Sequence, residues 1–67
     1  MPMSPIQPGE WVVIKEEGYG EPVGKVIMAE PSIAANSGWM CLIELDGGKT
    51  VRIATDKLEK APAHDQA

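Results

Sequence analysis

The sequence predicts an all-β fold, a small five-stranded barrel, from three observations. Segments rich in valine, isoleucine and tryptophan are separated by turns that contain glycine and proline. Within these segments the apolar residues do not recur with the 3.6-residue period of a helix. The 67 residues are enough for one domain only. A sheet this small is expected to close on itself, because closure removes unpaired strand edges.

The two ends of the chain are predicted to lie outside the folded body. Residues 1–8 contain three prolines, which disfavour helix and remove backbone donors, so an extended or disordered arm is expected there. Residues 62–67 are small and polar and are expected to form a disordered tail. The barrel is therefore predicted to span residues 9–61.

The strands and turns of this body are predicted in order along the chain. Four segments have the composition of strands, and they are residues 10–15, 23–30, 38–46 and 49–54. The Asp-Gly-Gly sequence at 46–48 predicts a tight hairpin, because glycine adopts positive φ without strain. Residues 55–60 are too short for a stable helix, and we expect a 3₁₀ turn followed by a short closing strand around Leu58.

The register of that hairpin predicts where the residues of the 49–54 strand point. Val51 and Ile53 have the alternating apolar spacing of residues that face a core. Arg52 lies between them and is predicted to point outward, because burying an unpaired arginine would cost several kcal/mol.

Two strands carry more apolar residues than one buried face needs. In residues 39–45 the two faces carry Trp39, Cys41, Ile43 and Leu45 on one side, and Met40, Leu42 and Glu44 on the other. Residues 11–14 likewise alternate Trp11 and Val13 with Val12 and Ile14. The surplus face is either covered by the long loops or is a docking surface, for which tryptophan is a favoured anchor. The candidate interface or ligand contacts are Trp11, Trp39, Met40, Leu42 and Arg52.

The order of these segments resembles that of SH3-like barrels over residues 8–60. The resemblance is carried by PGEWVVIK at the first strand, VGKVI at the second, and VRI and DKLEK near the end. It implies a five-stranded SH3-like barrel with a 3₁₀ turn before the last strand. It says little about function, because this fold serves many unrelated activities. At the level of the fold, the chain is also similar to small barrels that are accessory subunits of redox and photosynthetic complexes. This similarity implies docking on a larger protein.

Among SH3-like barrels, the chain is also similar to the plasmid-borne type II dihydrofolate reductases. These short proteins form an active-site pore at the centre of a homotetramer, and a Val-Gln-Ile-Tyr stretch after a hairpin forms the pore floor. The matching stretch here is Val51-Arg52-Ile53-Ala54, so the resemblance implies a ligand pore around Arg52 and Ile53. Arginine and alanine replace the two polar residues of that pore. Four symmetry-related arginines would repel one another, although arginine also suits an anionic ligand.

The charge of the chain argues against nucleic-acid binding. Ten acidic and six basic side chains give a net charge of −4 and a pI near 4.7, whereas nucleic-acid-binding proteins usually carry a basic surplus. A KOW- or Tudor-like nucleic-acid-binding barrel is therefore the third hypothesis. The basic residues in the last third of the chain that would serve it are Lys49, Arg52, Lys57 and Lys60.

The chain has one cysteine and one histidine, which limits its chemistry. Cys41 lies in an apolar run and is predicted to be a small core residue, while His64 falls in the tail. We therefore predict no disulfide, catalytic residue, metal or cofactor. The unpaired cysteine fits a reducing cytoplasm, and no apolar run approaches the ~20 residues of a membrane span or forms a signal peptide.

These observations predict a non-enzymatic binding or accessory module that self-associates or docks on a larger protein. A short chain without a disulfide or metal has a marginal core, which association with another chain would supplement. A reductase-like homotetramer is the alternative. The expected partner is a protein or a second copy of this chain, and a small anionic ligand is the other candidate. Neither nucleic acid nor a membrane is expected.

Overall fold

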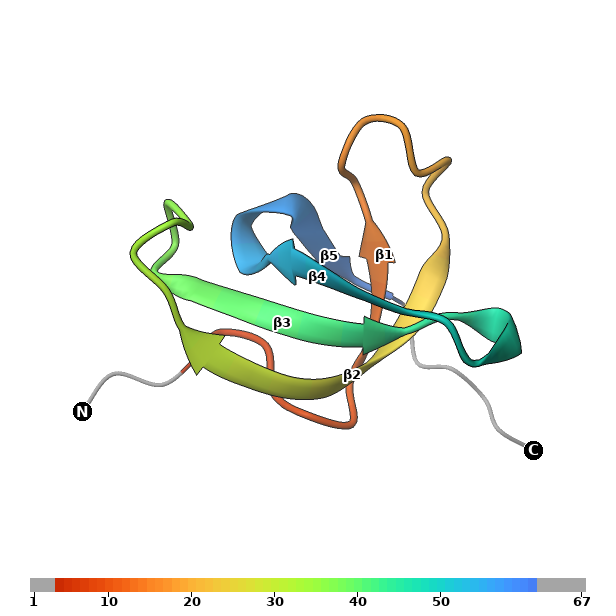
Figure 1. The fold of residues 1–67 in the computed structure, drawn as a ribbon, viewed down its shortest axis with the longest axis horizontal. Helices are drawn as coiled ribbons and strands as arrows, with labels where there is room; N and C mark the ends of the chain where they lie inside the picture. Colours follow the sequence, from red (N-terminus) through yellow and green to blue (C-terminus); the bar gives the residue numbers. More distant parts are fainter. Residues whose placement is uncertain (1–3, 62–67) are drawn as a thin grey trace.

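The structure is a computed structural model that describes residues 4–61, and it is all-β as predicted (Figure 1). Five antiparallel strands form one twisted sheet in the order β4-β3-β2-β1-β5. The strands are β1 (Trp11–Ile14), β2 (Val23–Pro31), β3 (Trp39–Glu44), β4 (Thr50–Ala54) and β5 (Leu58–Lys60). Two 3₁₀ turns, η1 (Asp46–Gly48) and η2 (Thr55–Lys57), precede β4 and β5. Among the described residues, no helical segment has the length and hydrophobicity needed to cross a membrane.

The sheet does not close, so the barrel is looser than the sequence led us to expect. β4 and β5 are the two ends of the sheet, and no ladder joins them. The three residues of η2 carry the chain from β4 to the far side of β1, where β5 pairs with β1. β5 has only three residues, and all of them pair with β1.

The core lies inside the curve of the sheet and is built from alternate residues of the strands. β1 contributes Val12 and Ile14, and β3 contributes Cys41 and Ile43, all fully buried. Cys41 is thus a core residue as predicted, and burial raises the pKa of its thiol. Gly24 of β2 lies directly against β3, where an added Cβ would be closer to the Cγ2 of Ile43 than van der Waals contact allows.

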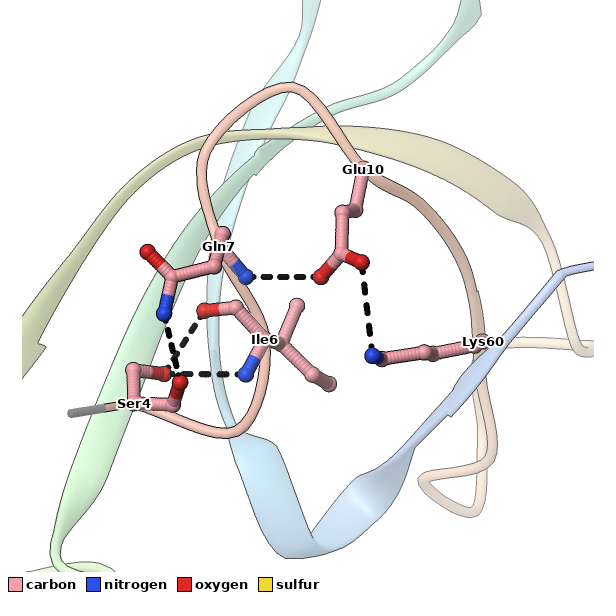
Figure 2. Close-up of polar contacts among 5 residues, drawn as sticks. All are labelled: Ser4, Ile6, Gln7, Glu10 and Lys60. Atoms are coloured by element: carbon pink, nitrogen blue, oxygen red, sulfur yellow. Dashed lines mark hydrogen bonds and ion pairs between the residues drawn. The ribbon is translucent and has the colours of Figure 1, made fainter.

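The folded body begins before residue 9, which corrects the expected boundary of an arm over residues 1–8. Ile6 is 4% exposed and belongs to the core cluster, and Ser4 is also buried. The Ser4 hydroxyl donates to the carbonyl of Ile6 at 2.7 Å and accepts from its N–H at 3.2 Å (Figure 2). Burial of the apolar Ile6 side chain in the core is more favourable in free energy than its exposure to water on a free arm. Residues 1–3 of the expected arm and the expected tail 62–67, including His64, lie outside the described residues.

Hydrogen bonds within the segment and one ion pair to β5 hold this N-terminal segment, residues 4–10, in place. The Gln7 N–H donates to the carboxylate of Glu10 at 2.7 Å, and the Gln7 side-chain amide donates to the carbonyl of Ser4 at 2.7 Å (Figure 2). Glu10 also forms an ion pair with Lys60 of β5 at 3.3 Å. These contacts lower the pKa of Glu10, mainly through the Gln7 backbone hydrogen bond, although partial burial opposes the shift.

The hairpin between β3 and β4 has the predicted turn and register. Gly47 and Gly48 have φ of +88° and +84°, and the Leu45 N–H donates to the carbonyl of Lys49 at 2.7 Å. The register pairs Cys41 with Ile53, so Ile53 points into the core at 3% exposure while Arg52 is exposed. Val51, expected to face the core, is half-buried and packs against its edge.

Candidate functional site

Three large apolar side chains lie side by side on the outer face of β2 and β3. Met40 and Leu42 alternate with the buried Cys41 and Ile43, so they point away from the core and are only half-buried. Leu42 pairs with Met28 of β2, which is 46% exposed. We call these three residues, Met28, Met40 and Leu42, the outer patch. Paired side chains on one face of a sheet are in contact distance, so the patch is continuous.

A β-bulge in β2 exposes a further apolar residue, Ile27, next to the outer patch. Val26 pairs with Ile43 and Met28 pairs with Leu42, which leaves Ile27 as an extra residue that has no paired residue in β3. The bulge lets Val26 face the core while Ile27 and Met28 are both exposed, at 44% and 46%. Two consecutive exposed apolar residues are unusual in a strand with one solvated face, where polar residues normally alternate.

Two opposite charges flank the outer patch on either side of β3. Glu30 of β2 pairs with Met40, and Arg52 of β4 pairs with Leu42. The Arg52 guanidinium nevertheless donates to the Glu30 carboxylate at 2.5 Å. Since β3 lies between the two, their side chains cross it diagonally between Met40 and Leu42 and cover part of both. This ion pair is exposed at both ends, so its contribution to stability is small.

A hollow of about 270 Å³ opens where the outer patch meets the loops. Met40, Arg52, Ile53 and Ala54 form one wall. The remaining walls come from three other segments. They are the loop after β2 (Ala34, Ala35 and Asn36), η2 (Asp56 and Lys57), and Glu16, which lies shortly after β1. The hollow therefore has both charges and small apolar residues in its walls. It suits an extended peptide or a small polar molecule better than a purely apolar ligand.

Three of the five residues singled out from the sequence come together, and two do not. Met40, Leu42 and Arg52 share the face just described. Trp11 lies on the outer face of β1, where the Lys25 ammonium is 6.0 Å from the centre of its ring. Trp39 begins β3, half-buried, and its backbone N–H donates to the Ser37 hydroxyl. The tryptophans are therefore parts of the scaffold around the outer patch and not its centre.

The four basic residues near the C-terminus differ in their surroundings. Arg52 is paired with Glu30, and Lys60 is paired with Glu10. Lys49 and Lys57 form no ion pair within residues 4–61, but they lie at opposite ends of β4. Arg52 and Lys57 both line the hollow, together with the acidic Glu16 and Asp56.

Sequence reasoning missed Met28, Glu30 and most of the walls of the hollow. The run Val26-Ile27-Met28 breaks the alternation of a strand, and that break is the signal that predicts a bulge. Glu30 could not be found in this way, because its role depends on lying two strands from Arg52. Within residues 4–61, no group of three His, Cys, Asp or Glu side chains is placed to hold a metal ion.

No protein-family model, curated protein or solved structure significantly matches this chain. The fold and the geometry of the outer face are therefore the basis for any functional conclusion.

Proposed function

We propose that this chain is a non-enzymatic binding module that associates with protein through the outer patch and its two flanking charges. The observation that carries the proposal is the outer face of β2 and β3, where three large apolar side chains adjoin one another in a position that a solvated sheet would fill with polar residues. Paired strands hold the backbone beneath these side chains in place, so little backbone entropy is lost on binding.

The composition of the patch also fits protein association. Methionine and arginine are enriched at interfaces, and the unbranched methionine side chain adapts to varied partners. The opposite charges beside the patch would contribute orientation rather than affinity. We further propose a cytoplasmic location, which is supported by the single, buried and unpaired Cys41.

Two matched substitutions on the same strand test this proposal. Met28→Glu places a charge inside the outer patch, and Val23→Glu places one at a similarly exposed apolar residue (40%) at the other end of β2. Association should be weakened by Met28→Glu and retained by Val23→Glu. The readouts are sedimentation velocity for self-association and affinity capture from the source cells for other partners. Equal association by both variants, with both folded by circular dichroism, would contradict the proposal.

Substitution at Met40 adds a second test in the neighbouring strand. Met40→Glu should weaken association more than it lowers the free energy of unfolding, because this side chain is half-buried at the surface rather than part of the core. A loss of stability without a loss of association would place Met40 in the scaffold.

A reductase-like homotetramer is the second candidate, favoured by one observation. Arg52, Ile53 and Ala54 line the hollow, and they occupy the stretch that resembles the pore motif of type II dihydrofolate reductases. The ion pair with Glu30 would also reduce repulsion between arginines brought together by symmetry. NADPH-dependent reduction of dihydrofolate, measured together with the solution mass, tests this candidate. A tetramer with activity that Arg52→Ala changes would favour it over the binding module.

A further inference from the structure

We infer that the partner of the outer patch is a second copy of this chain, packed face to face about a two-fold axis that runs along β3. This inference rests on the proposed function, since it uses the same surface. It adds the identity of the partner and the exchange of one ion pair between the two copies.

The layout of charge on the outer face is self-complementary. Arg52 lies on one side of β3 and Glu30 on the other, with Met40 and Leu42 between them. A two-fold axis along β3, in the plane between two facing sheets, exchanges these two sides. β2 of one copy then lies over β4 of the other. Arg52 of each copy comes beside Glu30 of the other copy, and the apolar residues of the two β3 strands meet at the centre.

The alternative in-plane axis, perpendicular to β3, produces the opposite result. It places β2 over β2 and β4 over β4, so Glu30 approaches Glu30 and Arg52 approaches Arg52. Like charges facing each other across an interface are strongly unfavourable. The positions of two side chains therefore distinguish the two arrangements, and they favour the axis along β3.

The side chains that would face each other also fit in size. In the favoured arrangement, Met28 lies opposite Arg52 of the second copy, whose aliphatic stem can cover a thioether side chain. Glu30 lies opposite Ala54 of the second copy, a small residue on that face of β4. Aligned sheets cross at about 30°, which leaves these neighbours within reach of long side chains.

The ion pair within one copy can be replaced by ion pairs between the two copies with little loss of stability. The side chains of Arg52 and Glu30 are 59% and 42% exposed, and an ion pair exposed to this degree contributes little to stability. When two copies meet, Arg52 remains beside a glutamate, which then comes from the partner and is shielded from water. Each copy contributes only three large apolar side chains and one ion pair, so we expect dissociation in the micromolar range.

Charge reversal in separate copies tests the exchange directly. Arg52→Glu would bring two glutamates together at each contact, and Glu30→Arg would bring two arginines together. Each variant alone should therefore self-associate at least tenfold more weakly than the wild type. In an equimolar mixture of the two, a mixed dimer has one glutamate and one arginine at each contact, so association should recover to within about threefold of the wild type. The doubly reversed variant, Glu30→Arg with Arg52→Glu, should recover it as a single species.

Sedimentation over roughly 1 to 500 µM measures these association constants, with circular dichroism to show that each variant is folded. Lys49→Glu is the control, because it changes the net charge as Arg52→Glu does but lies at the hairpin, away from the patch. The inference is overturned if the wild type stays monomeric throughout, if both single reversals still associate like the wild type, or if their mixture fails to recover. In the last two cases, loss of association in Met28→Glu would still support the proposed function, so the two failures are distinguishable.

Discussion

Replacing Gly24 with alanine tests how closely β2 and β3 approach each other. An ideal Cβ at this position would overlap Cγ2 of Ile43, and it would lie 2.9 Å from Cδ2 of Leu45 and 3.0 Å from the carbonyl oxygen of Glu44. Carbon atoms normally pack about 3.5–4.0 Å apart, so the Ile43 methyl would have to move aside. Ile43 is fully buried, which leaves it nowhere to go without displacing other core residues.

The size of the effect follows from two opposing contributions. Overpacking a core by a methyl group typically costs about 1–3 kcal/mol. Replacing glycine by alanine makes the unfolded chain stiffer, which offsets about 0.4–1 kcal/mol of that cost where the backbone allows it. We therefore expect Gly24→Ala to lower the free energy of unfolding by about 1–2 kcal/mol. In a domain of this size, that corresponds to a fall in Tm of roughly 5–15 °C.

A double-mutant cycle attributes the effect to the contact itself. Ile43→Ala removes the methyl group that the new Cβ would strike, so Gly24→Ala should cost at least about 1 kcal/mol less in that background. Ile53→Ala is the matched control, because it makes the same change at a buried core residue that is not among the contacts of Gly24, and the two substitutions should be additive. Thermal unfolding in sodium sulfate, which strengthens apolar burial, keeps the double variants measurable. A Gly24→Ala protein as stable as the wild type would refute the close approach of β2 to β3.

Four further predictions concern pH, the hairpin, Arg52 and charge. Because the pKa of Glu10 is lowered on folding, its stabilising contribution is complete above the ordinary glutamate pKa and is lost as pH falls through the lower, folded value. Glu10→Gln should therefore flatten the loss of stability below about pH 4.5, and an unchanged acid profile would count against the contact with Gln7. Gly47→Val should destabilise by about 1 kcal/mol or more in urea unfolding, because valine is strained at positive φ; wild-type stability would mean that the turn has another shape. Arg52→Ala should change stability by less than about 1 kcal/mol, and unfolding of this variant would show that the register is wrong. Fluorescence anisotropy with random single- and double-stranded DNA at physiological salt should detect no binding tighter than ~10⁻⁴ M, and a salt-sensitive micromolar complex would reverse that expectation.

Features of the fold that depend on local sequence could be predicted, and those that depend on distant contacts could not. The strands and the hairpin follow from β-branched segments and from the turn preference of Asp-Gly-Gly, which are properties of neighbouring residues. The burial of Ile6 depends on packing against core residues of several strands, which come together only in the folded sheet. The open edge between β4 and β5 likewise depends on how far η2 carries the chain.

The same division applies to the candidate site. Alternation along one strand was enough to place Met40 and Leu42 on the outer face and Arg52 outside the core. Met28 and Glu30 belong to another strand, and a bulge shifts that strand by one residue relative to β3. A one-residue shift moves side chains to the opposite face, so the partners of Arg52 and Leu42 could not be chosen without the observed register.

The pairing of β1 with β5 has a consequence for how the chain folds during its synthesis. Val12, Val13 and Ile14 pair with residues 58–60, so one edge of β1 has no partner until the ribosome has added Lys60. At roughly 5–20 residues per second, the interval between Ile14 and Lys60 lasts about 2–9 s. After β1 has left the ribosome and before β5 has done so, an apolar strand edge is open to wrong pairing with neighbouring nascent chains. We expect the native sheet to be completed only after this last strand emerges, so newly made chains depend more on chaperone protection than the folded protein does.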